Sequence, residues 1–334
     1  MSGCLRDGLA AMKVARGAAW LLLALHVSAG LAAEPYPFKT VRVVAPFAPG
    51  GTTDAVARVL AQQLAEQLGK SFIVDNRTGA GGIIANEIVA KAAPDGHTLL
   101  IANPAFAILP GLFKSLPYDP LKSFTPISEI MRAPNVLVAH PSVGVTALKD
   151  FIVLARAHPG KFNYGSGGAG SALHLYSELF KMSARVDLTH IPYKGGGDNM
   201  AALLGGQVHM NIIQYQANVL ALIKNGRLRA LAVTTNGKRS PALPDVPSMS
   251  EAGVAGMAVY SWSGLLGPAG MPRELVNKLH AEVVKMLAVP AVQERFAGQD
   301  AELAGSRPHE YAGLLRSEMS RWAEVVRSAG IVAQ

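Results

Sequence analysis

A glycine-rich turn with two threonines is the first segment whose residues could bind a ligand. It lies between an apolar run at 41–46 and a helical pattern at 53–68. Glycines let backbone N–H groups face a ligand, and a helix start adds unpaired N–H donors at the positive end of its dipole. We predict a carboxylate-binding turn, with an ordinary capped strand–helix turn as the alternative. Its predicted ligand-binding residues are Phe47, Ala48, Pro49, Gly50, Gly51, Thr52, Thr53 and Asp54.

Asp54 has a second interpretation within that turn. It stands in the first turn of the predicted helix, four residues before Arg58. A carboxylate there can cap the helix, or it can pair with the guanidinium one turn on.

A second glycine-rich turn, at 163–174, repeats this design with serines in place of threonines. It again follows an apolar run and precedes a helical pattern. His174, one turn into the helix, could face a ligand or have a structural role. The residues predicted to bind here are Ser166, Gly167, Gly168, Gly170, Ser171 and His174.

The second turn also has the spacing of a dinucleotide-binding fingerprint, with glycines at 165, 167 and 170 and Asp187 further on. In a dinucleotide fold the acidic residue ends the second strand, where it reaches the ribose. Here Asp187 precedes the predicted strand 188–192, and another strand, 136–139, comes before the turn. We therefore favour a carboxylate turn over a nucleotide site.

Further loops are predicted to complete the cleft, because ligands of open α/β sheets sit beyond the carboxyl ends of the strands. The loop at 103–106 contributes Asn103 and Ala105, and the loop at 193–198 contributes Tyr193 and Gly195. Gln214 is assigned to the far end of the ligand together with Asn103 and Tyr193. The glycine-rich segment 79–82 has two interpretations, a binding loop or a packing turn before a helix.

Sequence patterns of catalysis are missing. Tyr164 stands where a Gly-x-Ser-x-Gly nucleophile motif around Ser166 would need glycine. The histidines have no metal-ligand spacing, and neither an HExxH motif nor a phosphate-binding lysine loop occurs. We expect no catalytic residue, no cofactor and no metal, and hence a binding protein rather than an exported esterase or dehydrogenase.

The elements that must position these turns alternate between strand and helix patterns. The order strand–helix–strand–helix–strand over 41–102 indicates a parallel sheet with helices on both faces, and a similar order restarts at 136. Two long amphipathic helices, 273–288 and 308–327, follow an extended segment at 257–267. We predict an α/β protein with two lobes, joined by crossovers near 131–135 and 259–265 that act as a hinge. The first lobe would be 34–132 plus 260–334, and the second 133–259.

The amino-terminal residues 1–33 read as a signal peptide. Lys13 and Arg16 precede an apolar run too short to span a bilayer, and small residues follow it. We expect cleavage after Ala32 or Ala33, with Met12 as an alternative start. Cys4, the sole cysteine, would leave with this segment, so the mature protein would have no disulfide.

The formal charge of +8 falls by two when Arg6, Asp7, Lys13 and Arg16 are removed with the signal peptide. The remaining excess serves solubility or favours anionic solutes. Export, and the absence of basic runs with interleaved aromatics, argue against a nucleic-acid partner.

A set of ordered motifs runs along the chain at 36–39, 45–54, 76–82, 94–100, 163–174, 192–195, 204–208 and 243–247. Together they resemble the Bug-type extracytoplasmic solute receptors of tripartite tricarboxylate transporters. The resemblance covers about residues 36–331.

This resemblance implies a type II periplasmic-binding-protein fold with the ligand cleft between two lobes. It also implies a monomer in the periplasm that binds a small carboxylate, gripped by the turns 47–54 and 166–174 as if by pincers. The implied partners are two membrane subunits of a cation-coupled permease, and a membrane signalling protein is the alternative.

Two departures from the family pattern bear on the ligand. Members often carry an acidic residue shortly after the Gly-Gln-Val strand, where this chain has the longer stretch 211–216, and Asp198 stands where proline is common. We therefore predict a ligand without an ammonium group, an aliphatic or aromatic mono- or dicarboxylate.

Overall fold

The computed structural model describes residues 35–297 and 300–331. The chain divides into two compact units, Met1–Phe38 and Lys39–Gln334. The fold described below is that of the second unit. The predicted signal peptide, its cleavage sites and Cys4 lie outside the described residues. None of the described helices is long and apolar enough to cross a bilayer.

Two sheets share one long strand, β4 (Phe124–Ala139). The first sheet follows the predicted alternation: β1, β2 and β3 are parallel, and β9 runs antiparallel between β3 and β4. A short strand, β10, pairs with β4. The bounds are β1 Val41–Ala45, β2 Phe72–Asn76, β3 Thr98–Ala102, β9 Tyr260–Pro268 and β10 Glu302–Leu303.

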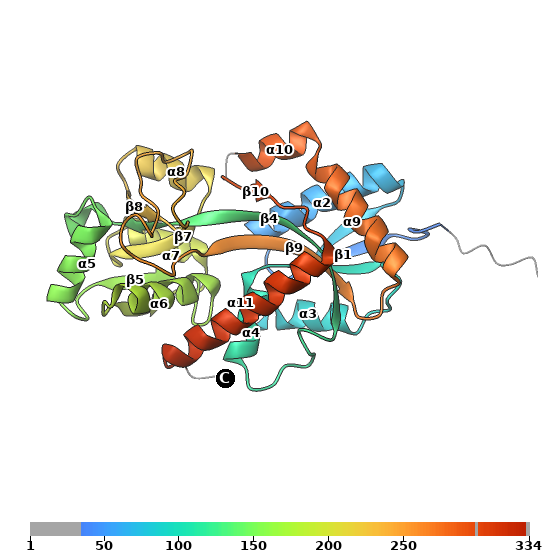
Figure 1. Cartoon of the computed structure of the whole chain (residues 1–334), viewed down its shortest axis with the longest axis horizontal. Helices are drawn as coiled ribbons and strands as arrows, with labels where there is room; N and C mark the ends of the chain where they lie inside the picture. The colour runs from blue at the N-terminus through green and yellow to red at the C-terminus, as the bar shows by residue number, and fades with distance from the viewer. Residues whose placement is uncertain (1–34, 298–299, 332–334) are drawn as a thin grey trace, which may run out of the picture. The chain divides into compact units, whose positions relative to one another are not determined.

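The second sheet forms on the other end of β4. There β4 pairs antiparallel with β7 and β8, and β5 lies parallel to both β6 and β7. The bounds are β5 Asn163–Ser166, β6 Thr189–Pro192, β7 Met210–Gln214 and β8 Arg229–Val233. β4 pairs with β9 up to Pro134 and with β7 from Asn135 onward. The chain is therefore a two-lobed α/β protein, in which β4 and β9 run side by side toward the second sheet (Figure 1).

Helices cover both sheets. Those of the first sheet are α2 Thr52–Leu68, the 3-10 turn η1 Ala80–Gly82, α3 Ile83–Ala90, α4 Pro104–Leu112, α9 Arg273–Leu287 and α10 Pro290–Ala297. Those that follow β4 around the second sheet are η2 Pro141–Val143, α5 Leu148–Ala157, α6 Ala172–Ala184, α7 Gly196–Leu204 and α8 Ala217–Lys224. The last helix, α11, spans Pro308–Ser328.

The prediction of a loop at 103–106 was wrong, because α4 begins there. Asn103 caps this helix by accepting a hydrogen bond from Ala105 N at 3.1 Å, and Pro104 occupies its first position. Proline is well suited to that position, since its missing N–H would have no partner there anyway. Helices α8 and α10 and the short strand β10 were also not predicted.

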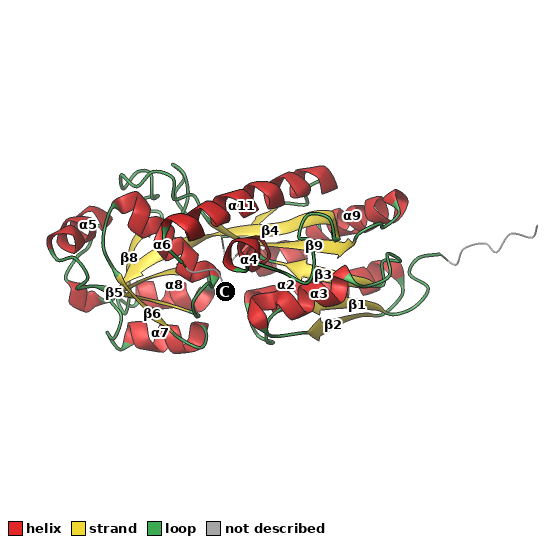
Figure 2. Cartoon of the chain, turned by 90° about the horizontal axis from the view of Figure 1, so that it is seen from below, coloured by secondary structure: helices red, strands yellow, loops and turns green. Residues whose placement is uncertain are grey.

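The carboxyl-terminal helices pack on elements of the first sheet. α9 and α11 both contact β4, and Figure 2 shows them along one side of β4 and β9. α11 also contacts α4 and reaches α6 of the second sheet. Near its end, Arg321 Nη1 donates to Ala258 O at 2.7 Å. This helix therefore connects elements of both sheets.

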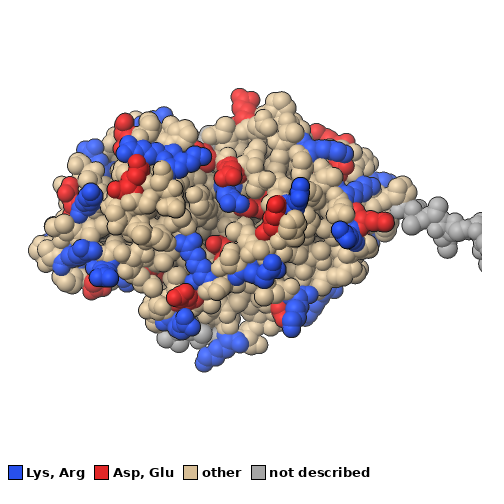
Figure 3. Space-filling view, viewed as in Figure 1, with Lys and Arg blue, Asp and Glu red and all other residues tan. Residues whose placement is uncertain are grey.

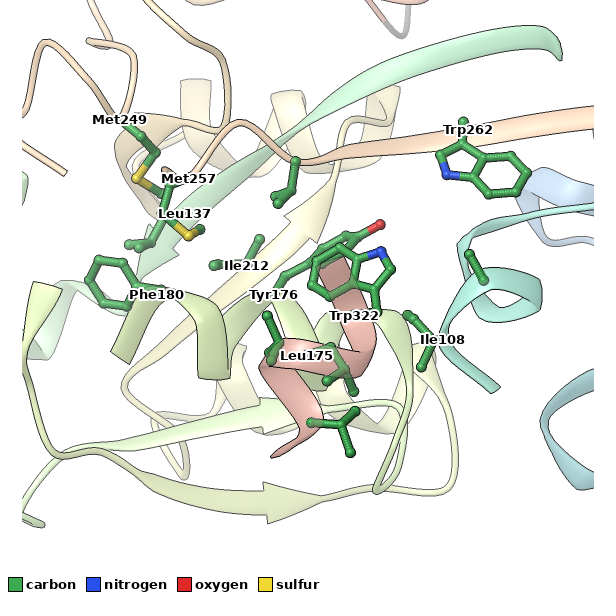
Figure 4. Close-up of a cluster of buried hydrophobic side chains, with 14 of the residues drawn as sticks. Ile108, Leu137, Leu175, Tyr176, Phe180, Ile212, Met249, Met257, Trp262 and Trp322 are labelled. Carbon is green, nitrogen blue, oxygen red and sulfur yellow. The ribbon is translucent and has the colours of Figure 1, made fainter. Parts of the chain in front are cut away.

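A continuous hydrophobic core joins the two sheets on the α11 side. It includes Val44 and Leu100 of the first sheet as well as Leu137 and Ile212 of the second. Figure 4 shows the part of it where α11 meets α6. Each large apolar side chain buried there contributes about 1.5–3 kcal/mol.

Candidate functional site

A cavity of about 450 Å³ lies where loops of both sheets meet. This volume is in the usual range for small-molecule sites. Its walls come from the turn before α2, η1, one face of α4, the turn before α6, and the ends of β7 and β9. The lining residues are Phe47, Thr52, Thr53, Ala80, Gly81, Asn103, Pro104, Ala105, Leu109, Leu112, Phe113, Gly167, Ala169, Gly170, Ser171, Ala172, Leu173, Gln214, Ser261, Trp262 and Ser263.

Asp54 supports the first glycine turn from behind. Its carboxylate accepts hydrogen bonds from Gly50 N at 3.0 Å, Arg58 Nε at 2.9 Å and Asn76 Nδ2 at 3.0 Å. Asn76 Nδ2 also donates to Phe47 O at 2.9 Å. Gly50 has a φ of 92°, which favours glycine. The predicted pairing of Asp54 with Arg58 is confirmed, and the carboxylate does not line the cavity.

The ionised form of Asp54 is favoured despite its burial. Burial by itself raises the pKa of this carboxyl, but the hydrogen bonds from Arg58, Gly50 and Asn76 outweigh it. The net result is a pKa below the ordinary value. The Asp54–Arg58 ion pair therefore adds no net charge behind the cavity.

Thr52 and Thr53 occupy the first two positions of α2, and both line the cavity. Thr52 Oγ1 donates to Gln214 Oε1 at 3.1 Å and accepts from Gln216 Nε2 at 3.2 Å. Thr53 Oγ1 accepts from Asn103 Nδ2 at 3.1 Å, which leaves its own hydrogen for another acceptor. The helix-capping residue, Gly51, provides no side-chain hydrogen bond to the first-turn amides. The start of α2 thus offers donors to the cavity.

One face of α4 lines the cavity along the whole helix. Pro104 and Ala105 lie at its start, Leu109 in its middle and Leu112 at its end. Leu112 closely approaches the turn before α6, because a Cβ added to Gly170 would lie 2.7 Å from Leu112 Cδ1. Gly170 also has a φ of 76°. Both the backbone conformation and the close approach therefore require glycine there.

Buried polar groups hold the turn before α6. Ser166 is fully buried, and its Oγ accepts from Gly168 N at 3.2 Å and lies 2.7 Å from His190 Nε2. Gly170 N donates to His174 Nδ1 at 3.0 Å. Ser171 caps α6, because its Oγ accepts from His174 N at 3.4 Å. Of these, Gly170 and Ser171 line the cavity, and Ser166 and His174 lie behind it.

His174 belongs to a stack of rings rather than to the cavity surface. Its ring lies against His190, with centroids 3.9 Å apart, and the ring of Tyr164 lies beside both, with its centroid 4.9 Å from that of His190 and 6.3 Å from that of His174. Burial lowers the pKa of His174. Burial, together with the neighbouring His174, lowers the pKa of His190 to about 4. Both rings are therefore neutral near pH 7.

The sequence-predicted residues fall into two groups. Those that line the cavity are Phe47, Thr52, Thr53, Asn103, Ala105, Gly167, Gly170, Ser171 and Gln214. Those that do not line it are Ala48, Pro49, Gly50, Gly51, Asp54, Ser166, Gly168, His174, Tyr193 and Gly195. Contact of any of them with a ligand stays a prediction.

Sequence reasoning missed most of the apolar wall. The missed residues are Ala80, Gly81, Pro104, Leu109, Leu112, Phe113, Ala169, Ala172, Leu173, Ser261, Trp262 and Ser263. The segment 79–82 had been left open between two interpretations. Ala80 and Gly81 line the cavity, whereas Gly82 packs at its back, where an added Cβ would lie 3.2 Å from Pro46 Cβ. The apolar spacing 105, 109, 112 would have predicted the lining face of α4, had the helix been recognised.

The cavity has no ionisable side chain among the described residues that line it. Three helices, α2, α4 and α6, begin at its wall, and their amino termini make it electropositive. On the face shown in Figure 3, basic and acidic side chains are interspersed rather than gathered into patches of one sign. Within residues 35–297 and 300–331, no group of three or more His, Cys, Asp or Glu side chains could hold a metal ion.

Comparison with known proteins gives consistent results. The family model described as tripartite tricarboxylate transporter family receptor matches residues 56–331. Protein BugT of Bordetella pertussis is 37% identical over 306 residues, which are 91% of this chain and 93% of BugT.

Solved structures are similar over nearly the same length. An R. palustris protein with adipate has a TM-score of 0.79 and 38% identity, covering 89% of this chain and 99% of its own. MatC from Rhodopseudomonas palustris, with bound malate, has a TM-score of 0.77 and 35% identity, covering 87% and 100%. The periplasmic binding protein BugD has a TM-score of 0.77 and 35% identity, covering 90% and 100%.

Proposed function

The chain belongs to the tripartite tricarboxylate transporter receptor family, and on that premise we propose that it captures a small carboxylate in this cavity. The observation that carries the proposal is the start of α2, whose first-turn amides have no side-chain cap and lie at a cavity without side-chain charge. A carboxylate there would accept hydrogen bonds from these amides and from Thr53 Oγ1. Ser171 and the first turn of α6 would approach it from the opposite wall. Hydrogen bonds to a charged group contribute about 1.5–3 kcal/mol each.

The similar proteins support a carboxylate ligand, because two of them are described with adipate and with malate. The family and the fold are those of solute receptors, and the proposed function has no catalytic step. A cavity built from amides and hydroxyls, without a base or a nucleophile at its wall, is consistent with binding alone.

The proposal extends to how the ligand is delivered. The lobes would be 34–132 plus 260–334 and 133–259, and they would close on the ligand about the crossing strands β4 and β9. The protein would act as a periplasmic monomer, exported by its signal peptide, and would pass the ligand to two membrane subunits of a permease. Membership of a tripartite transporter receptor family supports this partnership.

Thermal unfolding with a panel of carboxylates tests the binding proposal. A ligand that binds only the folded state raises the melting temperature, and the rise grows with the logarithm of the ligand concentration divided by the Kd. Thr53→Ala removes a hydroxyl donor from the cavity and should weaken binding about tenfold or more. Thr146→Ala, at an exposed position away from the cavity, should leave affinity unchanged.

The result that contradicts the proposal is equally clear. If no mono- or dicarboxylate in the panel shifts the melting temperature, the cavity is not a carboxylate site. Equal affinities of the Thr53→Ala variant and the unaltered protein would place the binding site elsewhere.

A further inference from the structure

We infer that the ligand binds as a monoanion, a monocarboxylate with an apolar aliphatic or aromatic body. This inference rests on the proposed function and narrows it. It follows from three properties of the cavity: its total positive charge, its free hydrogen-bond donors and its apolar wall.

Among the described residues that line the cavity no side chain is cationic, so its positive charge comes from helix termini. Each helix amino terminus is equivalent to about half an elementary charge, so α2, α4 and α6 together supply roughly one to one and a half. Neither α4 nor α6 has an acidic residue in its first turn, and Asp54 in α2 is neutralised by Arg58 at 2.9 Å. This balances one carboxylate. A second ionised carboxylate would lose its hydration without an opposite charge, which costs several kcal/mol.

The polar side chains at the cavity are largely bound to one another. Thr52 and Gln214 share a hydrogen bond, and Asn103 donates to Thr53. Ser261 Oγ, on β9, donates to Asn135 Oδ1 at 2.9 Å. The donors that remain, among them Gln214 Nε2 and Trp262 Nε1, are uncharged, so they do not balance the charge of a second carboxylate group.

The remaining wall is apolar and suits the body of an acid. Leu109 and Trp262 are each 3% exposed and Leu112 is 8% exposed, and all three line the cavity with Phe113 and Leu173. Burial of a hydrocarbon body against them removes apolar surface from water and stabilises the complex.

Phe113 separates this wall from the nearest cation along the chain. It lines both the cavity and a neighbouring surface groove, and Lys114 lines only the groove. The phenyl ring thus lies at the edge of the cavity, where a substitution could bring in a positive charge.

Matched pairs of acids test the inference. Isothermal titration calorimetry of the purified protein at pH 7.5 would compare hexanoate with adipate and benzoate with terephthalate. We expect each monocarboxylate to bind at least tenfold more tightly than its dicarboxylate partner. Adipate is the most demanding case, since a similar R. palustris protein is described with it. A dicarboxylate that binds as tightly as its partner, or more tightly, overturns the inference and leaves the proposed function intact. If no acid of either kind binds, the proposed function fails and the inference with it.

Two substitutions of Phe113 sharpen this test. Phe113→Lys places a cation at the edge of the apolar wall, and we expect it to raise the affinity for adipate relative to hexanoate by tenfold or more. Phe113→Met, which is apolar, should keep the preference of the unaltered protein for hexanoate. If the lysine variant still selects hexanoate as strongly as the methionine variant, charge balance does not set the preference and the inference is wrong.

The pH dependence of binding provides an independent readout. Adipate affinity should rise as the pH falls toward the second pKa of the diacid. The singly protonated form carries one negative charge, which is the charge that the helix termini can balance. Adipate affinity that stays constant or falls over the same range would contradict the inference.

Discussion

At the scale of single residues, the two glycine turns divide their polar groups between the cavity wall and its support. Thr52, Thr53 and Ser171 line the cavity, whereas Asp54 and His174 hold the turns from behind. Sequence reasoning found both kinds, because turn chemistry and helix capping are local. It could not separate them, because the direction in which a side chain points depends on neighbours distant in the chain. His174 illustrates this, since its stacking partner His190 comes from β6.

The stacked histidines make stability depend on pH. His190 has a folded-state pKa of about 4, below the value near 6.5 expected in the unfolded chain. The unfolded state therefore binds more protons between these values, so stability falls as the pH drops from about 6.5 to about 4. The difference between these pKa values corresponds to about 3 kcal/mol at most, and partial exposure of the His190 ring reduces the loss that we expect to the order of 2 kcal/mol, measured by urea unfolding at several pH values.

A pair of variants isolates that contribution from the titration of carboxylates. His190→Asn should flatten the pH dependence over this range, whereas His309→Asn, at an exposed position on α11, should not. An unchanged slope in His190→Asn would show that the stack does not control acid stability.

At the scale of elements, regular strand–helix alternation was predictable and several helices were not. The apolar runs of β1 and β3 and the helix that follows β1, α2, have simple periodicity. α4 was hidden because Asn103-Pro104 also favours a turn, and only the capping bond from Ala105 shows that a helix begins there. β4 was recognised only over 136–139. Its first part contains Pro126 and Pro134, and this part is a strand through its pairing with β9, which is distant in sequence.

The contact between α4 and the turn before α6 gives a prediction at this scale. Gly170→Ala introduces both an unfavourable φ and a clash with Leu112, so we expect it to destabilise the protein by about 1–3 kcal/mol and to weaken ligand binding. Chemical denaturation and calorimetry would measure these two effects.

A matched glycine separates the two causes. Gly226 has a φ of 69° and nothing within 4 Å of an added Cβ, so Gly226→Ala carries the backbone strain alone. In a background that carries Leu112→Ala, the substitution Gly170→Ala should cost less free energy of unfolding, and the difference is the part due to the clash. Equal losses in the two single glycine variants would mean that Leu112 does not press on this turn.

At the scale of the whole molecule, the two-lobed fold was predictable because the α/β pattern restarts after the first sheet. The packing of α11 against elements of the second sheet was not predictable, because it depends on tertiary contacts. Trp322 lies at this junction, where its ring is 5.2 Å from that of Tyr176 and its Nε1 donates to Glu318 Oε2 at 2.8 Å (Figure 4). The extents of the two lobes stay predictions.

The side chain of Trp322 should therefore stabilise the packing of both sheets. It is 1% exposed, and Trp322→Ala should cost about 3–5 kcal/mol, measured by circular dichroism during urea unfolding. Trp322→Phe, which keeps an aromatic ring beside Tyr176, should cost less. A loss within about 0.5 kcal/mol for the alanine variant, as at an exposed position, would show that this junction does not hold the sheets together.

The hydroxyl of Thr52 joins α2 to two glutamines of the second sheet's side, by hydrogen bonds of 3.1 Å to Gln214, at the end of β7, and 3.2 Å to Gln216, just beyond it. If the lobes close as proposed, these bonds would stabilise the closed form with or without a bound ligand. We expect a fraction of vacant molecules to be shut at any moment, a fraction that single-molecule distance measurements between the lobes would count. A membrane partner that recognises the closed form would then also bind some receptor molecules that carry no ligand. The strength of the hydrogen bonds between Thr52 and the side-chain amides of Gln214 and Gln216 would set the fraction of closed, ligand-free molecules.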